Sequence, residues 1–142
     1  MGGVRIWLYY IGKPRDRHAN AMVEEYVRRI SRYARCEMSE LKPGRADPWV
    51  KQPSASKILL DPGGRALDSA GFAALLQRAE REGRDLVFVV GGAEGLPADW
   101  RARADLLLSL SPMTFPHELA RVVLAEQIYR AFAALRGHPY PR

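Results

Sequence analysis

Leu86-Val87-Phe88-Val89-Val90-Gly91-Gly92-Ala93-Glu94-Gly95 is the stretch of this chain that decides its fold. Five apolar residues without polar alternation are typical of a strand buried on both faces of a parallel sheet. The glycines that follow end the strand, and they allow positive φ or a close approach of backbone to a ligand. Ligands of open α/β sheets bind at such strand ends. The stretch therefore predicts a parallel sheet and also the place of a site.

A second stretch of the same kind lies farther along the chain. The apolar run 106–108 predicts another buried strand, and it is followed by Leu110-Ser111-Pro112-Met113-Thr114-Phe115-Pro116-His117. The prolines fix the backbone here and remove hydrogen-bond donors. The hydroxyl groups can have two compatible roles, and we expect both: Ser111 or Thr114 caps the next helix, and these groups contact a ligand.

Strands and helices alternate on either side of these two stretches. Hydrophobic periodicity predicts strands at 4–10, 36–41, 57–60, 86–90 and 106–108, and helices at 19–30, 98–104 and 116–136. One more helix is predicted between a cap at Asp68 or Ser69 and Gly83. This order predicts an α/β fold with a mostly parallel sheet and helices on both faces, in a single domain spanning residues 1–142.

Two segments between these elements predict irregular structure. Asp61-Pro62-Gly63-Gly64 predicts a turn that closes the strand at 57–60. The segment 42–56 has prolines, glycines and charges but no periodicity, so we expect a loop there, pinned by Trp49.

The last helix is apolar on more than one face. Apolar residues recur from Leu119 to Leu135 at positions that no single stripe contains. A helix that is apolar nearly all round is buried on several sides. In a chain of 142 residues a partner subunit can supply one of these sides, so we predict a homodimer.

Composition limits the classes of protein to consider. The chain carries a formal charge of +6 and far more arginine than lysine, which suits a polyanionic partner as well as a simple solvated surface. Cys36 is the only cysteine, so an internal disulfide is excluded and no metal site is expected. The apolar start is too short to span a bilayer and has no signal-peptide pattern, so we expect a cytoplasmic protein that does not contact membranes.

Other motifs are weak when each is taken alone. The glycine turn at 91–95 is neither a dinucleotide fingerprint nor a P-loop, and it could serve only as a tight turn. Arg121 lies among apolar neighbours near the glycine turns, which favours substrate contact, whereas Glu126 is interpreted as a structural pair or cap. The tail His138-Pro139-Tyr140-Pro141-Arg142 could stack on a base and meet phosphate, or it could be a frayed terminus.

Taken together, these segments resemble the ribosomal RNA large subunit methyltransferase H (RlmH) family of the SPOUT superfamily. The resemblance covers most of the chain. It rests on the glycine turn at 91–95, the stretch 110–117, Arg121, the segment 125–131 and the tail 138–140.

The resemblance implies a fold, a cofactor and a reaction. The fold would carry a C-terminal trefoil knot, a rare exception to the usual topology rules, and the protein would be a homodimer. S-adenosylmethionine would bind in the knotted loops. The substrate would be 23S rRNA within the assembled ribosome, methylated at N3 of a pseudouridine. The residues expected to line the cofactor pocket are Leu60, Gly91, Leu110, Ser111, Pro112, Met113, Thr114 and Phe115.

The same resemblance suggests how the reaction would proceed. A sulfonium methyl is already electrophilic, so the enzyme needs in-line positioning and removal of the N3 proton. We expect His138, Tyr140 and Arg121 to line the target pocket, with His138 or Tyr140 relaying the proton. His117 would orient its loop. The tail would serve the active site of the partner subunit.

The chain departs from the family at two places. The region 42–56 is short where relatives carry another helix, and Pro141 stands where the family has a histidine, which favours Tyr140 as the base. Two alternatives stay open: a non-catalytic RNA- or ribosome-binding factor, and a SPOUT methyltransferase that acts on another RNA.

Overall fold

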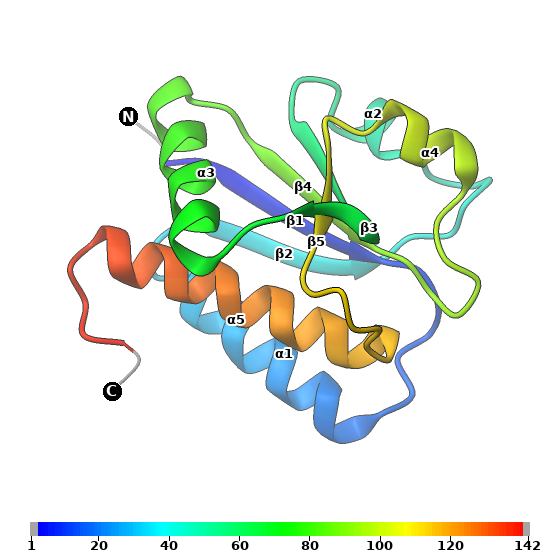
Figure 1. The fold of residues 1–142 in the computed structure, drawn as a ribbon, viewed down its shortest axis with the longest axis horizontal. Helices are drawn as coiled ribbons and strands as arrows, with labels where there is room; N and C mark the ends of the chain where they lie inside the picture. Colours follow the sequence, from blue (N-terminus) through cyan, green and yellow to red (C-terminus); the bar gives the residue numbers. More distant parts are fainter. Residues whose placement is uncertain (1–2, 141–142) are drawn as a thin grey trace.

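Five parallel strands form one sheet in the computed structural model, which describes residues 3–140. Their order across the sheet is β2-β1-β4-β3-β5 (Figure 1). The strands are β1 Arg5–Tyr10, β2 Arg35–Glu40, β3 Ser56–Ala66, β4 Leu86–Val90 and β5 Leu106–Ser109. The apolar stretch that predicted a buried strand is β4, at the centre of the sheet. The predicted α/β class with a parallel sheet is confirmed.

Helices cover both faces of the sheet, as predicted. The long helices α1, α3 and α5 lie on one face, and the short helices α2 and α4 contribute to the core on the other (Figure 1). The helices are α1 Arg17–Ile30, α2 Pro48–Lys51, α3 Ser69–Glu82, α4 Ala98–Arg103 and α5 His117–Leu135. Within residues 3–140, no helix has both the length and the apolar character that crossing a bilayer requires.

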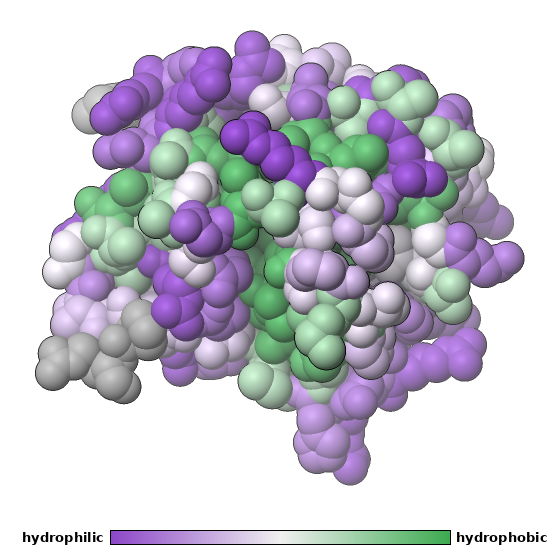
Figure 2. Space-filling model, in the orientation of Figure 1, coloured by the Kyte–Doolittle hydropathy of each residue, from purple (hydrophilic) through white to green (hydrophobic). Residues whose placement is uncertain are grey.

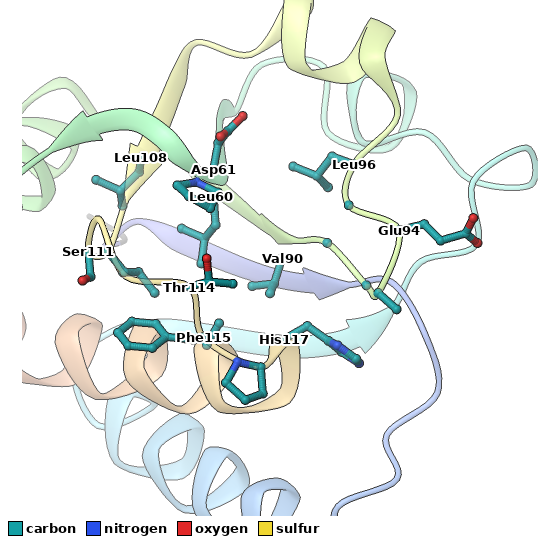
Figure 3. A pocket seen from close by; sticks show the side chains of 18 of the residues that line it. Leu60, Asp61, Val90, Glu94, Leu96, Leu108, Ser111, Thr114, Phe115 and His117 are labelled. Atoms are coloured by element: carbon teal, nitrogen blue, oxygen red, sulfur yellow. The ribbon is translucent and has the colours of Figure 1, made fainter.

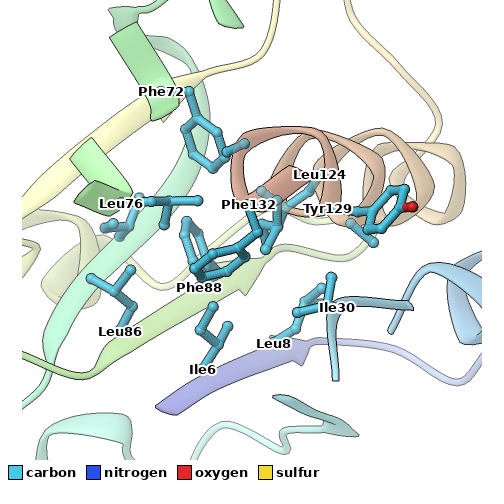
Figure 4. Close-up of a cluster of buried hydrophobic side chains, with 14 of the residues drawn as sticks. Ile6, Leu8, Ile30, Phe72, Leu76, Leu86, Phe88, Leu124, Tyr129 and Phe132 are labelled. Atoms are coloured by element: carbon cyan, nitrogen blue, oxygen red, sulfur yellow. The ribbon is translucent and has the colours of Figure 1, made fainter. Parts of the chain in front are cut away.

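The core explains why β4 shows no polar alternation. Phe88 faces the long helices and packs in a cluster with strand and helix residues (Figure 4). Val87 and Val89 face the opposite way, into a second cluster that contains Trp100 of α4. All five residues of β4 are at most 2% exposed. Because both faces are buried, every position of the strand is apolar.

Local capping sets the ends of α3. The Asp68 carboxylate accepts a hydrogen bond from the Gly71 N–H at 2.7 Å, so Asp68, not Ser69, is the cap. Gly83 ends the helix with φ of 64°, a left-handed conformation that glycine adopts without strain.

The turn predicted at 61–64 is wrong, because β3 continues through this segment to Ala66. Pairing with β5 is irregular between Leu60 and Arg65 and then resumes. A Cβ atom on Gly64 would lie 2.5 Å from the Leu107 carbonyl oxygen, so only glycine lets the two backbones come this close. Long-range pairing thus overrides the local turn preference.

The loop predicted at 42–56 contains one short helix, α2. Asp47 caps it by accepting from the Trp49 N–H at 2.7 Å. Trp49 packs edge-on against Trp100 with ring centroids 6.0 Å apart, so it does hold the segment down. The buried ammonium of Lys57 donates to the carbonyl oxygens of Gln52 and Ala55 and holds the end of the segment.

Most apolar residues of α5 are covered within one chain. The helix packs against α1 and α3, and nine of its residues are buried. Its burial therefore requires no second subunit, and the homodimer stays a prediction that α5 burial does not support. Met22 in α1 and Leu119 in α5 remain 50% and 44% exposed. In the face seen in Figure 2, apolar residues gather in a hollow near the middle, and hydrophilic residues take up much of the periphery.

Candidate active site

A cavity of about 550 Å³ lies beside the middle of β3 and the ends of β4 and β5 (Figure 3). Because β3 lies between β4 and β5 in the sheet, residues 60–62 of β3 meet the segments that follow the other two strands. The first turn of α5 closes the cavity from below through His117 and Ala120. Its volume falls within the range of pockets for small ligands.

Close backbone approaches shape the glycine turn on one wall. A Cβ atom on Gly91 would lie 3.0 Å from the Gly95 carbonyl carbon, and one on Gly92 would lie 2.8 Å from the Ile11 carbonyl oxygen. Gly95 itself has φ of 78° and donates to the Gly92 carbonyl oxygen at 3.0 Å. The glycines let the turn fold on itself and against the loop after β1, which brings it to the cavity.

The segment between β5 and α5 forms the facing wall. Ser111 Oγ accepts from the Met113 N–H at 2.9 Å, and α5 begins after Pro116 without any side-chain cap. The prediction that Ser111 or Thr114 caps this helix is therefore wrong. The backbone N–H groups of Leu110, Thr114 and Phe115 donate to no acceptor within residues 3–140. This wall offers free donors to a ligand.

Most residues that the family resemblance places in a cofactor pocket lie on these walls. Pro112 is the exception, since it is exposed and outside the lining. In Figure 3 the side chains of Leu60, Val90 and Thr114 lie near the centre, and Glu94 points outward. The lining residues among those expected are Leu60, Gly91, Leu110, Ser111, Met113, Thr114 and Phe115.

Sequence reasoning missed an ion pair at the rim of the cavity. Asp61 follows Leu60 in β3, and its carboxylate accepts from the Arg101 guanidinium at 2.7 Å. The two residues are forty positions apart in the chain, and no local pattern joins them. The Asp61 carboxylate also accepts from the Gly63 N–H at 2.8 Å, so both of its oxygens are held beside the opening.

Arg121 lies beside the cavity but outside its lining. The side chain is 1% exposed, and its guanidinium carbon sits 3.9 Å from the Tyr10 ring centroid. One terminal nitrogen donates to the Gly12 carbonyl oxygen at 3.5 Å, and Nε has no partner within the described chain. Burial lowers the pKa of this guanidinium. In this position Arg121 supports the loop after β1, and its contact with a substrate stays a prediction.

The tail lies away from the cavity of its own chain. The His138 N–H donates to the Ala133 carbonyl oxygen at 2.8 Å, and the Tyr140 hydroxyl donates to Glu126 at 2.8 Å. Glu126 is about 14 Å along α5 from His117, at 1.5 Å per residue. Within one chain, His138 and Tyr140, which were expected to contact the target base, therefore lie away from the cavity in which the cofactor was expected. Pro141 and Arg142 lie outside the described residues.

The fold and its strand-end cavity define an α/β protein with a ligand site at the carboxyl edge of a parallel sheet. Residues 4–141 match the family described as "Predicted SPOUT methyltransferase". The chain is 62% identical to "Ribosomal RNA large subunit methyltransferase H" of Solibacter usitatus, over 98% of this chain and 100% of that protein. It is 42% identical to a protein of the same name from Thermus thermophilus, over 98% of this chain and 99% of that protein.

Solved structures show the same fold at low sequence identity. A probable methyltransferase from Bordetella pertussis superposes with a TM-score of 0.61 at 13% identity, over 91% of this chain and 95% of that one. The SpoU methyltransferase AviRb from Streptomyces viridochromogenes was solved in complex with the cofactor AdoMet. It superposes with a TM-score of 0.56 at 11% identity, over 94% of this chain and 62% of that one. The chain belongs to the SPOUT methyltransferase family. Membership implies the C-terminal trefoil knot expected from the resemblance.

Proposed function

We propose that the protein is an S-adenosylmethionine-dependent methyltransferase that acts on large-subunit ribosomal RNA, at N3 of a pseudouridine in 23S rRNA. The observation that carries the proposal is the cavity in which the glycine turn meets the segment before α5. The relatives named as ribosomal RNA large subunit methyltransferases support the substrate. A net charge of +6 suits a polyanion, and a ribosomal substrate implies a cytoplasmic site of action.

The chemistry of the cavity fits the methyl donor. Leu60, Val90 and Leu108 supply apolar walls for the adenine ring and the carbon chain of the donor. The free N–H groups of Leu110, Thr114 and Phe115 can donate to adenine nitrogens or ribose oxygens. Within residues 3–140, no group of histidine, cysteine and carboxylate residues is arranged to hold a metal.

Different groups would perform different parts of the reaction. S-adenosylmethionine supplies an electrophilic methyl group when bound. The chain must then hold the pseudouridine in line with that methyl and accept its N3 proton. We assign the contact with the target to the tail, through the exposed His138. Arg121 supports the loop after β1 from beneath the cavity, and His117 orients the wall on which it lies.

A second copy of the chain would complete the site. The described tail is held far along α5, so it does not close its own cavity. In a homodimer the tail of one subunit can meet the cavity of the other. The half-exposed side chains of Met22 and Leu119 offer apolar surface for such a contact.

The test has a binding arm and a reaction arm. Calorimetry should detect stoichiometric binding of S-adenosylmethionine, and the variant Gly91→Val, whose side chain would collide with the Gly95 backbone, should lose it. Ribosomes from a strain that lacks the gene should gain one methyl group on a 23S pseudouridine, identified by mass spectrometry of RNA fragments. A protein that binds ribosomes without binding the donor would be a binding factor, and methylation of another RNA would correct the substrate.

A further inference from the structure

The Tyr140 side chain is held on several sides by its own subunit. Its hydroxyl donates to Glu126 Oε2 at 2.8 Å and lies 3.4 Å from the Tyr26 hydroxyl. Its ring packs edge-on against Tyr129 with centroids 4.6 Å apart, and the Arg130 guanidinium lies 5.5 Å from its centroid. Two helices, α1 and α5, thus hold one side chain of a segment that follows the last helix.

Glu126 is shared between the helix and the tail. The same Oε2 that accepts from Tyr140 accepts from Arg130 at 2.6 Å, with the spacing of one helical turn. The Glu126 side chain is only 16% exposed. Hydrogen bonds to an ionised acceptor in such a setting are stronger than neutral ones. An ordinary surface ion pair would account for the contact between Arg130 and Glu126. It would not account for the hydrogen bond that the Tyr140 hydroxyl donates to the same carboxylate.

The hydroxyl of Tyr140 is unsuited to accept a proton from the target. Burial, the hydrogen bond with Tyr26 and the Glu126 carboxylate all raise the pKa of Tyr140 above its usual value of 10.0. The group therefore stays protonated and donates. The backbone N–H of Tyr140 donates to His138 Nδ1 at 3.3 Å, so the position of Tyr140 also orients that imidazole, which is exposed.

We propose that Glu126 and Tyr140 form a tail latch: they are positioning residues that fix the end of the chain on α5 and so present His138 to the active site of a second copy. The part of this inference that concerns catalysis rests on the proposed function. The latch itself is a property of the chain without substrate. Tyr140 then acts through its anchored side chain and not as the base.

The first experiment measures the latch in the absence of RNA. Trypsin needs an extended peptide at Arg136, whereas the closed tail holds the Gly137 and His138 N–H groups on the last turn of α5, so we expect the cleavage rate to report the open population. Tyr140→Phe removes the hydroxyl and keeps the ring, and Glu126→Gln removes the charge and keeps the shape. Each should raise the rate of cleavage at this bond about tenfold. The control Glu82→Gln, which breaks the Arg78–Glu82 pair of the same helical spacing in α3, should leave the rate unchanged.

The second experiment separates an anchor from a base. Each single variant should lower kcat for ribosomal RNA methylation about tenfold or more, while calorimetry shows unchanged binding of S-adenosylmethionine. The double variant Tyr140→Phe/Glu126→Gln should be no worse than either single variant, because both remove one shared contact.

The outcomes are distinct for the latch and for the proposed function. Equal cleavage rates in the wild type and both single variants would overturn the latch. Loss of activity in Tyr140→Phe alone, with Glu126→Gln as active as the wild type, would also overturn it and return Tyr140 to the role of base. A wild-type protein that methylates no ribosomal RNA would refute the proposed function, and cleavage would still decide whether the latch exists.

Discussion

At the scale of single residues, the site depends on backbones that approach more closely than side chains allow. Gly92 lies against the carbonyl of Ile11, and Gly64 lies against the carbonyl of Leu107. The first contact joins two loops at the carboxyl edge of the sheet and the second joins β3 to β5, so a methyl group at either position would push apart two neighbouring segments. These glycines are needed for packing whether or not a ligand binds, and ligand binding uses the space that they create.

Gly64→Ala should destabilise the protein. Its new methyl would lie 2.5 Å from the Leu107 carbonyl oxygen, and the strands must shift to relieve the collision. We expect a loss of about 2 kcal/mol in the free energy of unfolding, measured by urea denaturation. Gly63→Ala is the matched control, because its Cβ would meet the nearest atom at an ordinary 3.5 Å. Similar losses in both variants would show that the close approach is not the cause.

The Cys36 thiol should resist alkylation in the folded protein. Burial, with a smaller contribution from Glu37, raises its pKa from 9.0 to about 12. At pH 8 the reactive thiolate is then on the order of 10⁻⁴ of the folded molecules, against about a tenth in an unfolded chain. Mass spectrometry after iodoacetamide treatment should find one modified site in guanidinium and almost none in buffer. Rapid labelling of the folded protein would contradict the burial of this thiol.

At the scale of elements, the first turns of α1 and α5 are joined by one carboxylate. Glu118 accepts hydrogen bonds from the backbone N–H groups of Arg15 at 2.8 Å and Asp16 at 3.0 Å. Asp16 is also the cap of α1, accepting from His18 and Ala19. The loop after β1 is thus fixed to the helix that closes the cavity, and the Gly92 contact with Ile11 connects it to the glycine turn.

This link should weaken in acid. The backbone hydrogen bonds from Asp16 and Arg15 lower the pKa of Glu118 below its ordinary value of 4.5. A carboxylate whose pKa is depressed in the folded state stabilises the fold above its unfolded pKa, and this contribution is lost as the pH falls through the folded pKa. The free energy of unfolding of Glu118→Gln should therefore fall less than that of the wild type below pH 4.5. Parallel acid slopes for the two proteins would contradict the link.

Elements set by local pattern were predicted well, and those set by distant pairing were not. The periodicity of α1 and α3 and the apolar run of β4 each depend on residues close in sequence, and the structure places them as expected. The extension of β3 past Leu60 depends on pairing with β5, more than forty residues later in the chain. Local sequence alone therefore predicts a turn at Gly63 and Gly64. The position of the tail on α5 likewise depends on Tyr26 and Glu126, which no motif in the tail identifies.

At the scale of the whole molecule, the cavity and the tail lie at different distances along α5. The cavity contacts its first turn, and Tyr140 contacts residues about 14 to 18 Å farther along. A chain with this arrangement can bind a ligand alone, but it cannot bring His138 to that ligand while the tail latch is closed. The two parts can act on one substrate if two chains pair so that the tail of each faces the cavity of the other.

Mixing two inactive variants tests this arrangement. Gly91→Val should disable the cavity, and His138→Ala should disable the tail, and each homodimer should be inactive. When the two are unfolded together and refolded as an equal mixture, half of the dimers contain one copy of each. If the tail acts across the dimer, each mixed dimer has one intact site, because the normal tail of one copy meets the normal cavity of the other. Methylation of ribosomes should then recover to roughly a quarter of the wild-type rate. If each tail served its own cavity, every site would carry one defect and the mixture would stay inactive.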